Sequence, residues 1–396
     1  MRVTLWSPNY PPELTGIPPL VADVAEWLAG RSHRVQVVTA FPNYPSRRIE
    51  PTYRGSLWRR EDRNGVRVDR AWLRVRPGES FLDKALYELT FSTVSLPLAA
   101  RAARDSDVVV CVIPTLLAAA YARVFKAFLP RLRLILWVQD LVVEGAAALD
   151  PSPLARRALS LGRAAERFAV RGADRIVVCS PGFRDYLTRL GAPANQIEIV
   201  YNWADTEWIS PAESNRTDSH TRFLYAGNVG YSQGLETLID AAALAGPACA
   251  VRIVGDGNAA EVVRTRAATV PSVLVEHPVP RDDYPRLLSE GDVHVVIQRH
   301  VSAGANLPSK IATALASGRP VLASIDRFTP AAKLLEESGG ALLVEPESPI
   351  RLAEAMQLLA GDRKLREELG RRGRRFAESR LSKRVALELL EQAIVG

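Results

Sequence analysis

Cysteine is scarce in this sequence of 396 residues, which contains only Cys111, Cys179 and Cys249. Each stands in an apolar, strand-like segment, and no CxxC or Cys/His spacing accompanies any of them. Isolated cysteines of this kind favour buried thiols in a reducing compartment over disulfide bonds or a metal site. We therefore assign no metal site from the sequence.

Long apolar runs are also missing. The longest, residues 108–122, is interrupted by Pro114 and is too short to cross a bilayer. The first residues enter a strand pattern directly, without the apolar region and cleavage site of a signal peptide. These absences lead us to expect a soluble, cytoplasmic protein.

Two common phosphate-binding motifs are absent as well. The first strand pattern is followed by SPNYPPELTGIPPL, which lacks the GxGxxG fingerprint of dinucleotide-binding enzymes. A GxxxxGK[ST] loop is not found either. In their place, Thr15 and Gly16 form a turn before a helical pattern, where the backbone can approach a ligand closely. The main sequence evidence for an NAD-dependent oxidoreductase is therefore absent.

Apolar strand patterns alternate with helical patterns along most of the chain, which predicts βαβ units and parallel sheets. The polar stretch at residues 210–221 interrupts this alternation, which then resumes. The predicted strands are Val3–Trp6, Val35–Thr39, Val108–Ile113, Leu134–Val138, Ile176–Cys179, Phe223–Ala226, Ala250–Val254, Val273–Glu276, Val293–Ile297, Pro320–Ala323 and Ala341–Val344. The length exceeds that of most single domains, so we expect two doubly wound α/β domains that bind ligands at the carboxyl ends of their strands.

The net charge of +7 is unevenly distributed. Basic residues gather in one part of the N-terminal half, at Arg47, Arg48, Arg54, Arg59, Arg60, Arg63, Arg67, Arg70, Arg74, Arg76 and Lys84. An amphipathic stretch with Leu82, Leu86 and Leu89 on one face follows them. Such a region can dock on anionic lipid, and the alternative is a solvated basic surface beside a core-facing helix. Nucleic acid is a weaker candidate, because no known binding motif accompanies the arginines.

Residues 300–324 (HVSAGANLPSKIATALASGRPVLAS) combine a loop of small residues with a helical segment and an apolar strand. Asn306, Ser309 and Lys310 stand where the loop enters the helix. Exposed backbone N–H groups, the helix dipole and the lysine cation together suit an anionic ligand. An ordinary loop–helix–strand connection is the alternative explanation.

Seven ordered motifs identify a family resemblance that covers nearly the whole chain. They are residues 10–45, VQDLVVEGA (138–146), ADRIVVCSPGF (173–183), VYNWADTEWISP (200–211), LYAGNVGYSQGLETLIDAA (224–242), IVGDG (253–257) and GANLPSKIATALASGRPVLAS (304–324). The sequence resembles the family 4 retaining glycosyltransferases, whose GT-B fold has two Rossmann-like domains facing across a cleft. Within that family it is similar to the branch of colanic-acid fucosyltransferases and O-antigen N-acetylfucosamine transferases.

The resemblance implies that residues 210–374 form the domain that binds the nucleotide-sugar donor. The turn Gly227–Gly234 would face the diphosphate, with Asn228 and Gln233 where many relatives have Arg and Lys. Arg299 and Lys310 would then be the available cations. The other donor-binding candidates are Gly16, Gly227, Gly255, Asp256, Asn306, Ser309 and Thr313. Ala305 and Thr313 replace a glutamate pair whose second member holds the ribose hydroxyls in most relatives.

The resemblance also implies that residues 1–209 bind the acceptor, with residues 375–396 packing back on this domain. Gln139 stands where many relatives have a histidine, and Asp140 and Glu144 follow it. Gln139 cannot act as a base, but it can form hydrogen bonds with a sugar hydroxyl. Asp140 would orient the acceptor hydroxyl or the donor sugar, whereas the alternative is that it caps a helix. The catalytic candidates are thus Asp140, Lys310 and Arg299.

The function implied is a retaining glycosyltransferase that moves a sugar from a nucleotide-diphosphate sugar to a hydroxyl of a lipid-linked saccharide or another cytoplasmic acceptor. No cofactor and no obligatory metal are expected, and the enzyme could associate peripherally with the inner face of the membrane. Two other functions stay open. A GT-B-type sugar-nucleotide 2-epimerase would bind the same donor without an acceptor, and a non-catalytic protein would bind the nucleotide sugar only.

Overall fold

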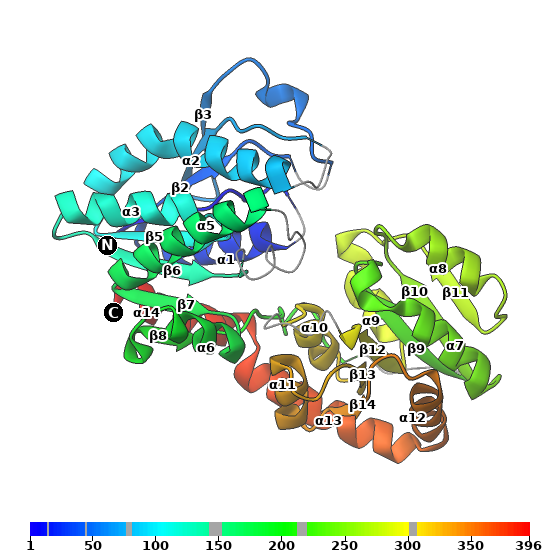
Figure 1. Cartoon of the computed structure of the whole chain (residues 1–396). Helices are drawn as coiled ribbons and strands as arrows, with labels where there is room; N and C mark the ends of the chain where they lie inside the picture. Colours follow the sequence, from blue (N-terminus) through cyan, green and yellow to red (C-terminus); the bar gives the residue numbers. More distant parts are fainter. Residues whose placement is uncertain (14–15, 44–45, 77–80, 142–152, 212–219, 301–306) are drawn as a thin grey trace. The chain divides into compact units, whose positions relative to one another are not determined.

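The computed structural model describes residues 1–13, 16–43, 46–76, 81–141, 153–211, 220–300 and 307–396 (Figure 1). The chain divides into two compact units. The first unit comprises Met1–Val200 and Leu387–Gly396, and the second unit comprises Tyr201–Ala386. From the sequence we expected a boundary after residue 209 and a return of residues 375–396 to the first domain. In the structure the second unit begins at Tyr201, and the return begins at Leu387.

The first unit is built on a sheet with the strand order β3-β4-β2-β1-β5-β6-β7-β8. Its strands are β1 (Arg2–Trp6), β2 (Arg34–Ala40), β3 (Trp58–Arg63), β4 (Val66–Ala71), β5 (Val108–Ile113), β6 (Arg133–Val138), β7 (Arg175–Val178) and β8 (Ile197–Ile199). All neighbouring pairs are parallel except β3 and β4. The continuous apolar run of β5 is buried along its whole length, as a central parallel strand requires.

Helices connect these strands. They are α1 (Ile17–Gly30), α2 (Phe81–Arg104), α3 (Leu116–Phe128), α5 (Pro153–Gly172) and α6 (Pro181–Arg189), and α14 (Lys383–Val395) ends the chain. In α1, the buried residues Val21, Val24, Ala25 and Leu28 recur at helical spacing. They form the apolar stripe that a helix packed on a sheet needs.

The second unit contains an entirely parallel sheet with the order β11-β10-β9-β12-β13-β14. Its strands are β9 (Thr221–Ala226), β10 (Cys249–Val254), β11 (Val273–Glu276), β12 (Val293–Ile297), β13 (Val321–Ser324) and β14 (Ala341–Val344). Its helices are α7 (Leu235–Ala245), α8 (Ala260–Ala267), α9 (Tyr284–Glu290), α10 (Lys310–Ala316), α11 (Pro330–Ser338), α12 (Pro349–Gly361) and α13 (Arg363–Arg380).

Both sheets reverse their strand order beside their first strand. In the second unit the reversal lies between β9 and β12, and in the first unit it lies between β1 and β5. Open α/β sheets bind ligands at such switch points, outside the carboxyl ends of the strands. The topology therefore points to one candidate site in each unit.

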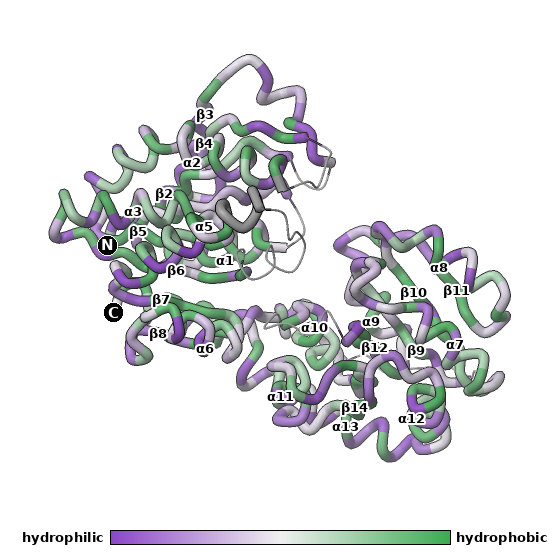
Figure 2. Tube along the Cα trace, viewed as in Figure 1, coloured by the Kyte–Doolittle hydropathy of each residue, from purple (hydrophilic) through white to green (hydrophobic). Residues whose placement is uncertain are grey.

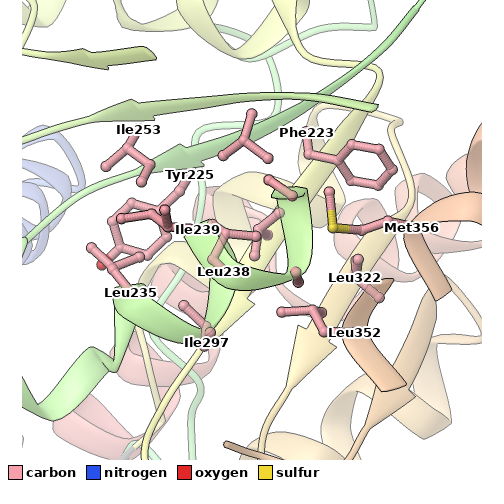
Figure 3. Close-up of a cluster of buried hydrophobic side chains, with 14 of the residues drawn as sticks. Phe223, Tyr225, Leu235, Leu238, Ile239, Ile253, Ile297, Leu322, Leu352 and Met356 are labelled. Atoms are coloured by element: carbon pink, nitrogen blue, oxygen red, sulfur yellow. The ribbon is translucent and has the colours of Figure 1, made fainter. Parts of the chain in front are cut away.

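The core of the second unit fixes the position of β9. Figure 3 shows side chains from four strands meeting those of α7 and α12: Phe223, Tyr225, Ile253, Ile297, Leu322, Leu235, Leu238, Ile239, Leu352 and Met356. Hydrophilic residues, coloured purple in Figure 2, dominate outer helices such as α13. All three cysteines are buried free thiols, as predicted, and burial raises the pKa of each.

The arginine-rich region differs from our expectation. Residues that we assigned to a basic surface form the antiparallel hairpin of β3 and β4, closed by Asn64 and Gly65 with positive φ. Arg70 is only 1% exposed and forms an ion pair with Glu61. Its guanidinium also donates to the carbonyl oxygen of Ala40 at 3.2 Å. Arg70 is therefore a structural residue of the first unit and adds nothing to a basic surface.

The helix that follows, α2, presents part of its leucine face to solvent, and membrane docking stays a prediction. Leu82 and Leu89 of α2 are 65% and 46% exposed, so they do not face the core. Leu86 is half-buried and Phe91 is fully buried. No helix among the described residues has the length and apolar character needed to cross a membrane.

Candidate functional site

Glycines bring two strand ends of the second unit into close contact. A Cβ atom added to Gly255, which follows β10, would lie 1.8 Å from the carbonyl oxygen of Gly227, which follows β9. One added to Gly257 would lie 2.4 Å from the carbonyl oxygen of Val229. The backbones also exchange hydrogen bonds, from Gly227 N to Val254 O at 3.0 Å and from Val229 N to Asp256 O at 2.9 Å. Only glycine fits at these two positions, because a side chain would collide with the backbone of the neighbouring turn.

Lys310 brings an amine to this edge from the first position of α10. Its Nζ lies 2.7 Å from the hydroxyl of Tyr225, 4.0 Å from the centre of the Tyr225 ring and 3.4 Å from Oε1 of Gln233. A Cβ on Gly227 would stand 3.4 Å from the same Nζ. The amine therefore faces the open side of the glycine turn. Burial lowers the pKa of the Lys310 ammonium to about 7.

Arg299 is differently engaged. It follows β12, and its backbone N and side-chain Nε donate to the carbonyl oxygens of Ser232 at 3.0 Å and Tyr231 at 2.8 Å. Its guanidinium pairs with Glu236 at 3.2 Å and Glu347 at 3.3 Å. Arg299 thus stabilises the short 3₁₀ turn Tyr231–Gln233 (η3) by hydrogen bonds, and its positive charge is paired with two carboxylates.

The remaining donor-binding candidates lie around the same edge. Gln233 accepts from Lys310, and Asn228 is exposed in the turn after β9. Asp256 is exposed, and its carboxylate accepts from the N–H of Gly257 at 2.9 Å. Thr313 points its hydroxyl back along α10 to the carbonyl oxygen of Lys310 at 2.9 Å.

Ser309 and Asn306 were also predicted to bind the donor at this edge. Ser309 is exposed at the N-cap position of α10, without a capping hydrogen bond from its side chain. Asn306 and Ala305 lie outside the described residues. The structure thus brings Gly227, Asn228, Gln233, Gly255 and Lys310 together, whereas the roles assigned to them stay predictions.

The acceptor candidates lie in the first unit, directly after β6. Gln139 is half-buried, and its backbone N–H donates to Ile113 O at 3.2 Å. Asp140 is exposed, and its carboxylate accepts from the N–H of Leu141 at 2.8 Å. Glu144 lies outside the described residues. Gly16 has a φ of 80° at the N-cap position of α1, so glycine is favoured there.

A polar cluster after β1 escaped the sequence analysis. Glu13 is only 4% exposed, and its carboxylate accepts from Asn43 N at 2.9 Å and from Asn9 Nδ2 at 3.2 Å. Tyr87 of α2 lies against the same asparagines, and burial raises the pKa of its hydroxyl to about 12. The cluster ties the turn after β1 to the segment after β2. The sequence PPELTG could have indicated this cluster, because a carboxylate among prolines and apolar residues needs a hydrogen-bonding partner if it is buried.

Two other features of the described residues belong to neither candidate. A hollow of about 970 Å³ lies along the starts of β9, β10 and β11, away from the glycine turns. Arg252 on its wall pairs with Glu276 and Glu290. Within the described ranges, no three His, Cys, Asp or Glu side chains gather as a metal site would require.

Comparison with family models divides the chain in two. Residues 15–203 match the glycosyl transferase 4-like domain, and residues 220–362 match glycosyl transferases group 1. Among curated proteins, the chain is 30% identical over 366 residues to WcaI of Escherichia coli. WcaI is described as a colanic acid biosynthesis glycosyl transferase. The match covers 88% of this chain and 89% of WcaI.

Comparison with solved structures agrees with the two-sheet architecture. HepE of Anabaena, solved with UDP, has a TM-score of 0.72 at 15% identity and covers 99% of both chains. WaaG, a glycosyltransferase of lipopolysaccharide biosynthesis, has a TM-score of 0.69 at 13% identity and covers 100% of both chains. These likenesses show the GT-B fold and confirm the predicted fold class.

Proposed function

The chain belongs to the group 1 glycosyltransferases with a glycosyl transferase 4-like domain, and on that premise we propose that it transfers a sugar from a nucleotide-diphosphate sugar to a saccharide hydroxyl. The observation that carries this proposal is the Lys310 amine, which faces the glycine turn at the switch point of the second unit. A diphosphate leaving group needs a preorganised cation at such a position, because negative charge develops on it as the glycosidic bond breaks.

The donor belongs to the second unit in this proposal. The diphosphate lies against Gly227 and Lys310, and the base and ribose lie near Asp256 and Thr313. Support comes from HepE, which has been solved with UDP and with UDP-glucose.

The acceptor belongs to the first unit, where Asp140 orients its hydroxyl and Gln139 binds the saccharide. The acceptor oxygen forms a bond to the anomeric carbon while the bond from that carbon to the diphosphate breaks. The departing phosphate oxygen takes the hydroxyl proton, and attack from the same face retains the anomeric configuration. Asp140→Asn, which keeps the shape but removes the charge, should lower turnover more than nucleotide affinity.

The proposed reaction needs no obligatory metal, because Lys310 supplies the positive charge at the diphosphate. A chelator should therefore leave turnover unchanged. Loss of activity on chelation, restored by Mg²⁺ or Mn²⁺, would contradict this part of the proposal.

We further propose that the acceptor is lipid-linked and that the first unit contacts the cytoplasmic face of a membrane. On α2, Leu82, Ala85 and Leu89 are exposed at positions i, i+3 and i+7, and Lys84 is exposed beside them. Apolar residues flanked by basic ones bind anionic bilayers reversibly, with about 1 kcal/mol from each basic residue near the surface. The printed role of WcaI in colanic acid biosynthesis is consistent with a polysaccharide product.

Mass spectrometry after incubation with a panel of nucleotide sugars tests the activity. A glycosyltransferase should consume one donor much faster when an extract of lipid-linked saccharides is added. Conversion of the donor to an isomer without any acceptor would favour the 2-epimerase instead. A bound donor that is never consumed would favour a non-catalytic nucleotide-sugar-binding protein.

A further inference from the structure

Tyr225 connects the second unit's core to its candidate diphosphate site. Its ring is fully buried among Leu235, Leu238 and Ile239 of α7 (Figure 3). Its hydroxyl donates to the carbonyl oxygen of Asn228 and accepts from the Lys310 amine at 2.7 Å. A hydroxyl on a packed aromatic ring has little freedom to move, whereas the lysine stem is flexible. Tyr225 therefore determines where the amine lies.

In the part of the chain that the structure describes, no carboxylate pairs with the Lys310 amine. Among the described residues, the elements packed against it contribute Tyr225 from β9, Gln233 from η3, Tyr284 from α9 and His294 from β12. His294 is buried, which lowers its pKa to about 3 and keeps it neutral. Nearby Arg299 is paired with its own two glutamates.

We propose that Tyr225 is a positioning residue, whose hydroxyl holds the Lys310 amine against Gly227 so that it takes up a proton when the donor diphosphate binds. This inference rests on the proposed function of the second unit. The ring face and the hydroxyl oxygen both favour the protonated amine, and the arriving dianion favours it further. The proton comes from the solvent, so the bound complex holds one more proton than the separate partners.

The proposal predicts how donor affinity depends on pH. Below about pH 7 the free amine is already protonated, so binding takes up little proton. Above that pH the free amine is neutral, so binding consumes a proton and affinity falls as pH rises. Removal of the Tyr225 hydroxyl takes away an acceptor for the charged form. The midpoint of the affinity profile should then move to lower pH.

Tyr225→Phe is the decisive variant, because it keeps the buried ring and removes only the hydroxyl. Tyr121→Phe in α3 of the first unit is the matched control. Binding of UDP-glucose, GDP-mannose and dTDP-glucose without acceptor is measured by calorimetry between about pH 6 and about pH 8.5, in buffers of different ionisation enthalpy. Intact nucleotide sugars are the suitable probes, because their diphosphate has no proton that titrates near neutral pH.

We expect the natural protein to take up a proton on binding above about pH 7. Tyr225→Phe should bind the same donor about tenfold more weakly at pH 7.5, with its midpoint at lower pH. Lys310→Met should abolish the proton uptake, and Tyr121→Phe should change nothing. Near-ultraviolet circular dichroism verifies that each variant is folded.

Three results would overturn the inference. If folded Tyr225→Phe keeps the natural affinity and midpoint, Tyr225 does not position the amine, although the proposed function stands. Proton uptake that persists in Lys310→Met would assign the proton to another group. If the natural protein binds none of the probes and consumes no donor of the panel even with the extract of lipid-linked saccharides present, the proposed function itself fails.

Discussion

The two units follow the first strand of their sheets with turns of opposite chemistry, although the topology at both switch points is alike. After β9, residues Gly227–Gly234 include three glycines and no acid, and a partly buried amine faces them. After β1, residues 7–13 include three prolines and a buried carboxylate, which is held by amide groups. The fold supplies the location in each case, and local residues decide the chemistry.

The difference follows from what each turn leaves uncovered. Glycines in the second unit leave the turn without bulky side chains beside the Lys310 cation, which suits an anion. Side chains fill the turn of the first unit, where Glu13 fixes the backbone against Asn43. An anion would be repelled there by Glu13. Neutral hydroxyl groups are the better ligands for such an edge, which agrees with our proposal that the first unit binds the acceptor and the second unit binds the donor.

The largest expected effect comes from removing the cation. Lys310→Met should lower turnover by about a hundredfold or more, because its contact strengthens as the diphosphate departs. Lys333→Met in α11, an exposed position, is the matched control. Steady-state kinetics with saturating donor provide the measurement. Near-normal turnover in a folded variant would move the assignment to Arg299.

The same variant has a predicted effect on stability. At pH below about 7, Lys310 is charged in both folded and unfolded chains, and the folded state bears the cost of burying that charge. As pH rises above 7 the folded chain releases the proton first, so this cost declines. Lys310→Met should therefore raise the free energy of unfolding by a few kcal/mol at about pH 6 and by less at about pH 9. Denaturant titration at both pH values tests the sign.

The buried acid of the first unit provides the next largest effect. Glu13→Ala leaves the N–H of Asn43 and the amide of Asn9 without their acceptor, which should cost about 1–3 kcal/mol of stability. Glu13→Gln keeps an acceptor oxygen and should recover part of it. Asp185→Ala, at a carboxylate that is 70% exposed, is the control. Donor affinity should be unaffected. A loss of donor affinity would contradict the assignment of the donor to the second unit alone.

A smaller effect is expected at the surface of α2. Replacing Leu82 and Leu89 together by Ser should weaken binding to anionic liposomes about tenfold, because two exposed apolar side chains no longer enter the bilayer. Leu274→Ser, at an exposed leucine of the second unit, is the control. Sedimentation with vesicles of increasing anionic content measures the change. If liposome binding changes with neither the anionic lipid content nor the salt concentration, the first unit does not have the proposed membrane role.

The smallest effect concerns the ribose. Thr313→Glu restores a carboxylate that the family resemblance places at the ribose hydroxyls, and it should tighten binding of the free nucleotide by a few-fold. Thr313→Gln separates the effect of charge from that of size. Calorimetric titration gives both affinities. A large loss of affinity would show that nucleotide fills this edge of the second unit in another way.

The alternating pattern of the chain was sufficient to predict most strands of both sheets, because buried parallel strands are continuous apolar runs. The hairpin of β3 and β4 was missed. Its edge strand reads as a charged segment, and eight positively charged or acidic residues near Asn64 and Gly65 concealed the turn signal of that dipeptide. The burial of Arg70 was equally invisible, since its partner Glu61 becomes a neighbour only when the hairpin closes.

Some residues of the candidate site were likewise predictable from the sequence, and others were not. Sequence motifs located Gly227, Gly255 and Lys310, because glycine spacing and a lysine at a helix start are local features. Tyr225 was overlooked as a residue of an apolar strand, although its hydroxyl lies beside an amine 85 residues further along the chain. Glu13 was overlooked because its partner Asn43 is distant in sequence.

The sequence by itself determined the α/β class, the expected family and the glycine turns, because periodicity and local motifs are written in neighbouring residues. Only the tertiary structure decided that Arg299 is paired with two carboxylates whereas the half-buried Lys310 lies beside a tyrosine. Burial and charge pairing depend on groups that folding brings together from separate elements. They cannot be calculated from spacing along the chain.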